Sequence, residues 1–313
     1  MKIIIALILC GSLAFAQKGG LENKFKLMKS TSVSVRRQAV RDIGRMRQAA
    51  SVKILSGALE NDSDFGVRAM AAEALGNMRS KKAVPSLVKA LGDKNRNVRS
   101  SVVVAFGYIR AKDSVKPLAE YLKSETDLGL RLSALNVLGV IGSNEAAPAL
   151  LEALSGKNPR LSSIAAQSLG RMRYSKALRP LLKAAKSKNE SLRIAAVKAL
   201  GEIRNPGAVK GLETLLEKEK ALNVKYAIVH SLAQLGSDKG FEIALEAAGS
   251  KNINTKRTGI RALGLMKTKT KEIEDIVVEA SKSKNRGLKR DAVATASYLG
   301  IKLPKKKTPD AKK

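Results

Sequence analysis

The sequence is poor in the side chains that perform most catalytic and metal chemistry. Its 313 residues include one cysteine, one histidine and no tryptophan, and aromatic residues make up 3%. One cysteine cannot build a disulfide framework within the chain. Paired histidines, cysteine clusters and glycine-rich phosphate loops are also missing from the sequence. We therefore predict no catalytic residues, no metal site and no cofactor, and a binding protein rather than an enzyme.

Acidic residues are scarce as well. The chain has 59 lysines and arginines against 27 aspartates and glutamates, which gives a formal net charge of +32. Such an excess favours acidic or polyanionic partners, although it says nothing directly about the fold. The alternative is a lysine-rich solvated surface that serves no partner.

The first residues are typical of an export signal. Lys2 is followed by an apolar stretch over 3–13 and by Ala14 and Ala16, which are small residues at the two cleavage-site positions. This pattern predicts a signal peptide over residues 1–16 and a periplasmic or secreted protein. The stretch is too short to span a bilayer, which needs about 20 residues. A second interpretation makes Cys10 a lipidated cysteine of a membrane-anchored lipoprotein, although the bulky Leu9 precedes it.

A repeated phrase predicts the fold. Its clearest copy runs from Val67 to Gly76, and successive copies begin 31 to 33 residues apart. The nine starts are Val35, Val67, Val98, Leu130, Leu161, Leu192, Val224, Thr255 and Leu288. Each phrase has the apolar spacing of an amphipathic helix, and a shorter helical pattern such as Ala83–Leu91 precedes it. We predict nine helix pairs, each with a first and a second helix.

Good helix N-cap residues precede the second helices by a constant distance. They stand three residues before eight of the nine starts, with Ala221 as the exception. The set is Ser32, Asp64, Asn95, Asp127, Asn158, Asn189, Asn252 and Asn285. Side-chain oxygens of these types accept hydrogen bonds from first-turn amides, so they predict where each second helix begins.

The phrase Val-Arg-x-x-Ala-Ala-x-Ala-Leu-Gly, followed by Ala-Val-Pro-x-Leu, resembles HEAT repeats of the short phycobilisome-lyase type over residues 21–301. The resemblance implies an all-α, right-handed, armadillo-like solenoid whose second helices line the binding side. We expect an N-terminal cap or half-repeat over 17–30, the repeats over 31–301 and a disordered basic tail over 302–313.

Basic residues recur one position after the starts. The resemblance implies that they pair with acidic loop residues, and Asp62, Asp93 and Glu125 stand five residues before their starts. Later loops have Gly156, Ser187, Ser250 and Ser283 there, with Glu219 as the acidic exception. We therefore consider the later basic residues as partner-binding candidates: Arg193, Lys225, Lys256 and Lys289.

Lysines also stand four residues before six of the starts, directly before the N-caps. They are Lys94, Lys157, Lys188, Lys220, Lys251 and Lys284. Lysine is electrostatically disfavoured at a helix N-terminus, so its recurrence suggests a row of anion sites. A solvated turn in a lysine-rich protein is the alternative.

Arginines form a stripe in the first repeat. Arg37, Arg41 and Arg45 follow one another at four-residue spacing, and Arg257 and Arg261 repeat the arrangement in the eighth copy. These guanidinium groups could bind carboxylates or phosphates through two hydrogen bonds. The alternative is a polar outer face on a terminal repeat.

These observations predict an exported, non-catalytic scaffold that binds an acidic protein or an anionic envelope polymer, such as lipopolysaccharide or another glycan. Peripheral membrane contact would suit the same surface. We expect no nucleic-acid partner unless the N-terminal segment is not an export signal. A lyase accessory subunit is the alternative that the family resemblance suggests. The single histidine, His230, is expected on a surface or concave face rather than in a catalytic role, and the oligomeric state stays open.

Overall fold

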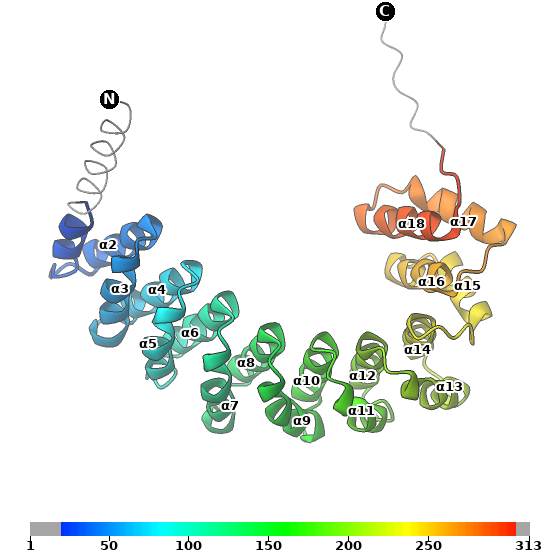
Figure 1. The fold of residues 1–313 in the computed structure, drawn as a ribbon, viewed down its shortest axis with the longest axis horizontal. Helices are drawn as coiled ribbons and strands as arrows, with labels where there is room; N and C mark the ends of the chain where they lie inside the picture. The colour runs from blue at the N-terminus through cyan, green and yellow to red at the C-terminus, as the bar shows by residue number, and fades with distance from the viewer. Residues whose placement is uncertain (1–19, 305–313) are drawn as a thin grey trace, which may run out of the picture. The chain divides into compact units, whose positions relative to one another are not determined.

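The structure is a computed structural model that describes residues 20–304. Within this range it consists of α-helices and short 3-10 helices, without a strand, which confirms the predicted all-α solenoid of helix pairs (Figure 1). The predicted signal peptide, Cys10 and most of the predicted basic tail lie outside the described residues. Export and lipidation therefore stay predictions.

The chain divides into two compact units between Ala149 and Leu150. The first unit begins with helical residues 20–27. Its further helices are α2 (Val33–Met46), α3 (Ala49–Asn61), α4 (Phe65–Asn77), α5 (Val84–Ala90), α6 (Arg96–Ile109), α7 (Val115–Ser124) and α8 (Leu128–Ile141). The boundary between the units falls within α9 (Ala147–Ser155).

The second unit continues the same alternation. Its helices are α10 (Pro159–Arg171), α11 (Leu178–Ala184), α12 (Glu190–Ile203), α13 (Val209–Lys218), α14 (Leu222–Gln234), α15 (Phe241–Gly249), α16 (Ile253–Met266), α17 (Lys271–Ser281) and α18 (Arg286–Leu299). The even-numbered helices are the nine predicted second helices, and the odd-numbered ones are first helices. Single 3-10 turns precede five first helices: Lys81–Ala83, Lys112–Ser114, Asn144–Ala146, Ser175–Ala177 and Pro206–Ala208.

The predicted N-caps begin the second helices. Seven of their side chains accept a first-turn amide hydrogen bond: Asp64, Asn95, Asp127, Asn158, Asn189, Asn252 and Asn285. Ser32 and Ala221 stand at the same position without a side-chain cap bond. Cap residues thus set the helix boundaries in most repeats.

Neighbouring second helices approach closely at the glycines that end the repeated phrase. A Cβ placed on Gly76 of α4 would lie 2.7 Å from Ala105 Cα of α6. A Cβ on Gly170 of α10 would lie 2.8 Å from Ala199 Cα of α12. Any side chain at these positions would force the helices apart. The repeated glycine is therefore a packing requirement, and the second helices form one continuous layer within each unit.

Six of the nine second helices end on basic residues in a left-handed conformation. Arg47, Arg79, Arg110, Arg173, Arg204 and Lys267 have φ between 50° and 57°. The left-handed conformation costs a non-glycine residue about 1 kcal/mol. A positive charge at a helix C-terminus interacts favourably with the helix dipole and offsets part of this cost.

Replacing Gly76 with alanine is expected to destabilise the chain by about 1–3 kcal/mol, because the added methyl group meets the backbone of α6. Gly57→Ala is the matched control, since nothing lies within 4 Å of a Cβ at this helical position. The control should stabilise the chain by about 0.5–1 kcal/mol through helix propensity. Urea unfolding of both variants measures the two effects, and equal shifts would contradict the close approach.

Candidate functional site

Arginines one residue after the second-helix starts form ion pairs with the loop of the next repeat. The pairs are Arg36–Asp62, Arg68–Asp93, Arg99–Glu125 and Arg193–Glu219, with Nε to carboxylate distances of 2.8, 2.6, 2.8 and 2.9 Å. Each guanidinium also donates to two backbone carbonyls just before its own helix. We call these four pairs the arginine ladder. It confirms the three expected acidic partners, and it engages Arg193, which the sequence suggested for partner binding.

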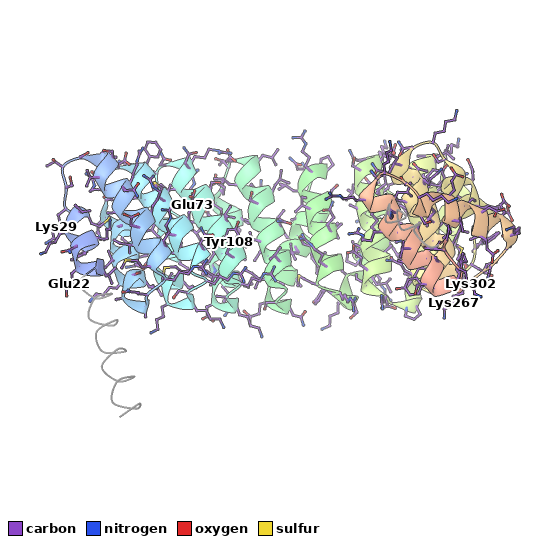
Figure 2. All side chains as sticks on the ribbon, turned by 90° about the horizontal axis from the view of Figure 1, so that it is seen from above. Glu22, Lys29, Glu73, Tyr108, Lys267 and Lys302 are labelled. Carbon is purple, nitrogen blue, oxygen red and sulfur yellow. The ribbon has the colours of Figure 1, made fainter. Side chains whose placement is uncertain are left out.

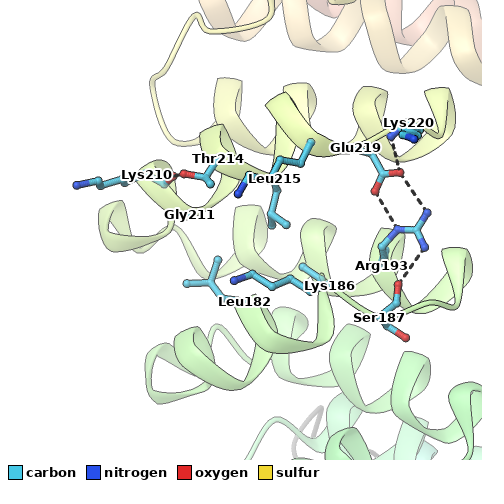
Figure 3. Close-up of a pocket in the computed structure, with 12 residues that line it drawn as sticks. Leu182, Lys186, Ser187, Arg193, Lys210, Gly211, Thr214, Leu215, Glu219 and Lys220 are labelled. Atoms are coloured by element: carbon cyan, nitrogen blue, oxygen red, sulfur yellow. Dashed lines mark hydrogen bonds and ion pairs between the residues drawn. The ribbon is translucent and has the colours of Figure 1, made fainter.

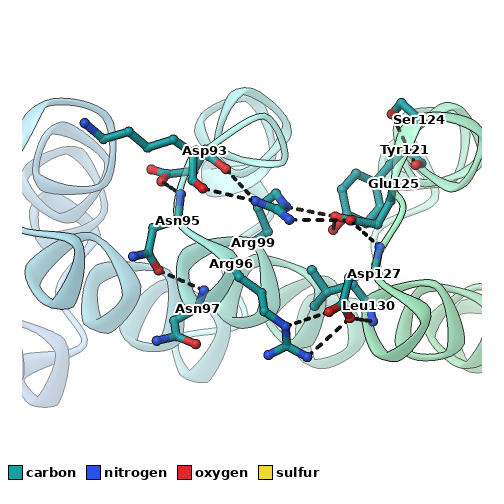
Figure 4. A network of polar contacts seen from close by, with 11 residues as sticks. Asp93, Asn95, Arg96, Asn97, Arg99, Tyr121, Ser124, Glu125, Asp127 and Leu130 are labelled. Carbon is teal, nitrogen blue, oxygen red and sulfur yellow. Dashed lines mark hydrogen bonds and ion pairs between the residues drawn. The ribbon is translucent and has the colours of Figure 1, made fainter.

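Figure 4 shows the rung at Arg99. Its Nε lies 2.8 Å from Glu125 Oε2, and the hydroxyl of Tyr121 donates to the same oxygen. The backbone amide of Asp127 donates to the other oxygen at 2.8 Å. Burial by itself would raise the pKa of Glu125, but these three donors lower that pKa to about 2. The carboxylate therefore stays ionised and holds two repeats together.

Glu125→Gln is expected to lose about 3 kcal/mol of stability at pH 7, as the depressed pKa implies. A carboxyl group whose pKa is lowered by folding stabilises the folded state above its ordinary pKa of 4.5. That stabilisation disappears as the pH falls from 4.5 through about 2. The difference between the variant and the parent chain should therefore shrink toward zero by pH 2, as followed by urea unfolding.

Glu120→Gln is the control for this prediction. Glu120 pairs with Lys123 at 2.9 Å on an exposed helix surface. Its loss should cost less than about 0.5 kcal/mol at any pH, because exposed ion pairs contribute little. A pH-independent deficit in the Glu125 variant would show that packing rather than charge stabilises the rung.

The six lysines before the N-caps lie exposed on the loops that lead into α6, α10, α12, α14, α16 and α18. Lys94, Lys157, Lys188, Lys220, Lys251 and Lys284 form no ion pair within the described residues. The first-turn amides expected to help them bind anions already donate to N-cap side chains, as at Asn158 and Asn252. Anion binding at these lysines stays a prediction.

The arginine stripe of the first repeat is partly engaged. Arg37 Nη2 lies 2.8 Å from Asp64 Oδ1, and Arg41 donates to Gln38. Arg41 and Arg45 line a hollow of about 400 Å³ together with Glu73 on α4. Glu73 and Tyr108 lie on the exposed side of the second helices in this unit (Figure 2). Side chains of both charges thus line the hollow.

The two arginines that repeat the stripe in the second unit, Arg257 and Arg261, contact different partners. Arg257 pairs with the buried Asp291 at 2.7 Å. Arg261 Nη2 of α16 lies 3.1 Å from His230 Nε2 of α14. A guanidinium can only donate, so Nε2 of His230 accepts and Nδ1 carries the proton. The two expected partner-binding arginines therefore have different roles: one binds a carboxylate and the other binds an imidazole.

His230 lies on the second helix α14 and is buried, with 9% of its surface exposed, whereas the sequence predicted an imidazole on a surface or concave face. Burial, and then the charges of Arg261 and Lys198, lower its pKa to about 4. Lys198, His230 and Arg261 share one register, six residues after the starts of three successive second helices. They form a row on the second-helix layer of the second unit, which we call the polar row.

A glutamate stands beside the polar row. Glu202 of α12 and Lys198 line a hollow of about 410 Å³ between α10 and α12, together with Gln167 and Arg171. Desolvation raises the pKa of Glu202, although Arg171 and Lys198 act in the opposite direction. A protonatable carboxyl group and a neutral imidazole thus lie on neighbouring helices. Groups of this kind can transfer protons to and from a bound molecule.

Sequence reasoning missed Lys198 and Glu202. Their spacing was the available signal: Lys198 and His230 both stand six residues after a start, and Glu202 and Arg171 both stand ten residues after one. The remaining sequence-based candidates Lys225 and Lys256 are half-buried, and Lys289 is exposed. The structure does not bring these three lysines to the polar row.

The titration of His230 tests the geometry of the polar row. Because it is the only histidine of the chain, its ring proton resonances can be followed in NMR spectra without assignment. We expect a pKa near 4. Arg261→Gln should raise this pKa toward its ordinary 6.5, because the variant removes a neighbouring positive charge. Arg257→Gln, one helix turn away, should leave it nearly unchanged, and an ordinary pKa in the parent chain would contradict the burial.

Within residues 20–304, no group of three or more histidine, cysteine, aspartate or glutamate side chains is placed to hold a metal ion. Over the same range, no helix has both the length and the apolar character needed to cross a membrane.

Comparison with known proteins identifies the repeats and one enzyme subunit. The family of HEAT repeats matches residues 24–105, 84–170 and 147–233. Phycocyanobilin lyase subunit alpha of Nostoc sp. (strain PCC 7120 / SAG 25.82 / UTEX 2576) is 26% identical over 161 residues. The match covers 45% of this chain and 58% of that relative.

Two solved structures are similar to parts of the chain. The complex of CpcE and CpcF of phycocyanin lyase from Nostoc sp. PCC7120 gives a TM-score of 0.43 at 23% identity and covers 79% of this chain and 93% of that chain. An engineered protein gives a TM-score of 0.46 at 19% identity, with 89% and 88% covered.

The likeness to a lyase subunit corrects two predictions. The expected non-catalytic scaffold for anionic polymers is wrong, because the matched relative is a subunit of an enzyme. The expectation of a chain without an enzymatic role is wrong for the same reason. The absence of motifs misled the sequence analysis, since a subunit can contribute to catalysis without carrying a recognisable motif of its own.

The prediction of the family is confirmed. The matched segments run without a gap from residue 24 to residue 233, which is more than half of the chain. The periodic N-caps, the glycine contacts and the arginine ladder repeat through the same segments. The chain belongs to the family of HEAT-repeat proteins.

Proposed function

We propose that the chain is an accessory subunit of a lyase and acts together with a second protein. The observation that carries the proposal is the 26% identity over 161 residues with phycocyanobilin lyase subunit alpha. The chain spans 58% of that relative, so the substrate and the protein partner are parts of the proposal. A HEAT solenoid offers an extended layer of second helices on which a client protein can lie.

The polar row supports this function. Lys198 and Arg261 supply positive charges for the carboxylates of a substrate such as an open-chain tetrapyrrole. Glu202 has a raised pKa and His230 a lowered one, so one group holds its proton more tightly and the other less tightly than usual. The addition and elimination steps of a lyase require both loss and gain of a proton, which such a pair can assist.

Reconstitution of the lyase reaction tests the proposal. The chain would replace the alpha subunit in the Nostoc phycocyanobilin lyase, with phycocyanobilin and the apo-acceptor protein present. We expect covalent bilin on the acceptor, seen as zinc-induced fluorescence on a denaturing gel, above a reaction without the chain. Glu202→Gln and His230→Gln should each lower the initial rate by at least about tenfold.

Lys176→Gln is the matched control, because it removes a charge from an exposed 3-10 turn that does not line the hollow beside the polar row. Its rate should equal that of the parent chain. If the folded chain neither binds phycocyanobilin, as judged by its absorption spectrum, nor promotes its attachment, the lyase assignment is wrong.

A further inference from the structure

The layer of first helices contains two grooves at the same register, one in each unit. In the second unit a groove of about 660 Å³ lies between α11 and α13 (Figure 3). In the first unit a groove of about 590 Å³ lies between helical residues 20–27 and α3. Both volumes fall within the range of roughly 300–1,000 Å³ that is typical of small-molecule sites.

Equivalent residues line the two grooves. Counted back from the following second-helix starts, Lys186 corresponds to Lys29, Lys210 to Lys53 and Glu219 to Asp62. The carboxylates at the end of each groove belong to the arginine ladder, where Arg193 and Arg36 bind them. The two grooves therefore share two equivalent lysines and one carboxylate that is already neutralised, and Lys218 and Lys220 also line the second-unit groove.

The pair of lysines distinguishes these two repeat boundaries from the other six. The same two positions elsewhere hold Asn61 and Val84, Gly92 and Lys116, Ser124 and Ala147, Ser155 and Leu178, Lys218 and Phe241, and Gly249 and Glu274. None of these has two lysines. Both repeat boundaries that have a lysine at each of the two positions also have a groove. The two boundaries lie 157 residues apart in the sequence, counted from Lys29 to Lys186.

A glycine lines each groove, at a different register in the two repeats. Gly211 of α13 occupies a position that is proline in three other repeats, at Pro85, Pro117 and Pro148. A Cβ at Gly211 would lie 2.7 Å from Leu182 Cδ2, within the groove. In the first unit, nothing lies within 4 Å of a Cβ at Gly57, which lines the other groove.

The walls and the rim of the second-unit groove differ in character. Leu182, Ala185 and Leu215 supply apolar surface, and the side chain of Lys186 extends between the two leucines (Figure 3). Neither Lys186 nor Lys210 has an ion-pair partner among the described residues. The groove thus offers an apolar slot with free positive charge, which matches a molecule with an apolar body and an anionic group.

We propose that each groove binds an amphipathic carboxylate of the fatty-acid class. The acyl chain lies along the apolar walls, and the carboxylate interacts with the lysine pair. The grooves lie on first helices, whereas the polar row lies on second helices. The proposal is therefore independent of the lyase assignment and would hold if that assignment failed.

Isothermal titration with dodecanoate below its micelle concentration tests the proposal on the full chain. We expect two sites per chain. Gly211→Leu and Gly57→Leu should each leave one site, because a leucine side chain fills one slot. Circular dichroism of both variants checks that they fold.

Charge is tested by Lys186→Gln combined with Lys210→Gln, which should weaken binding at one of the two sites roughly tenfold. Lys176→Gln removes a lysine outside the groove and should change nothing. Dodecyltrimethylammonium, which has the same chain and the opposite charge, should bind at neither site. Equal binding of this cation, a stoichiometry that the glycine variants do not change, or no dodecanoate binding would each overturn the proposal.

Discussion

The close approach of neighbouring second helices is the constraint on which the rest of the structure depends. At Gly76 and Gly170 the next helix lies where a side chain would otherwise be. Interiors packed at this density do not tolerate an extra methyl group without displacement. The glycines therefore fix the register of each helix against the next. Because the register is fixed, residues that occupy equivalent positions in successive repeats form straight rows within a unit.

The arginine ladder and the polar row are two such rows with opposite roles. The ladder joins loops, and each of its charges is neutralised by a carboxylate and by backbone carbonyls, so little of its charge faces solvent. The polar row carries Lys198 and Arg261 beside a buried neutral imidazole, and neither cation forms an ion pair within the described residues. A charged row that folding has not neutralised can interact with a substrate, whereas the ladder cannot do so without breaking the fold.

The sequence predicted the parts of the structure that depend on local patterns. The repeat starts, the N-caps and the acidic partners of Arg36, Arg68 and Arg99 follow from fixed spacings along the chain. The burial of His230 and the desolvation of Glu202 depend instead on side chains from neighbouring helices about 30 residues away. The grooves depend on side chains that are missing, at Gly211 and Gly57, so a search for chemically active residues passes over them. The net charge did not predict where a binding site lies, because the excess lysines are spread over the exposed loops.

The arginine ladder explains why some later repeats have a lysine or a serine in place of the ladder arginine. Where the loop acid is replaced by serine, the arginine is replaced too: Ser162 stands with Ser187, Lys225 with Ser250 and Lys256 with Ser283. The hydroxyl of Ser162 lies 3.0 Å from the carbonyl of Ala153 in α9 and 3.3 Å from the carbonyl of Gly156 in the following loop, and so keeps a loop contact without charge.

Arg131 shows the cost of keeping the ladder arginine where the loop acid is lost. It keeps its guanidinium while Gly156 stands at the position of the acid, and its buried Nε has no hydrogen-bond partner among the described residues. A buried charged donor without a partner costs free energy. Lysine avoids this cost, because its flexible stem can carry the ammonium group out to water. The positive charge at Lys225 and Lys256 is therefore explained by the loss of the loop acid, and it does not by itself identify a surface for a partner.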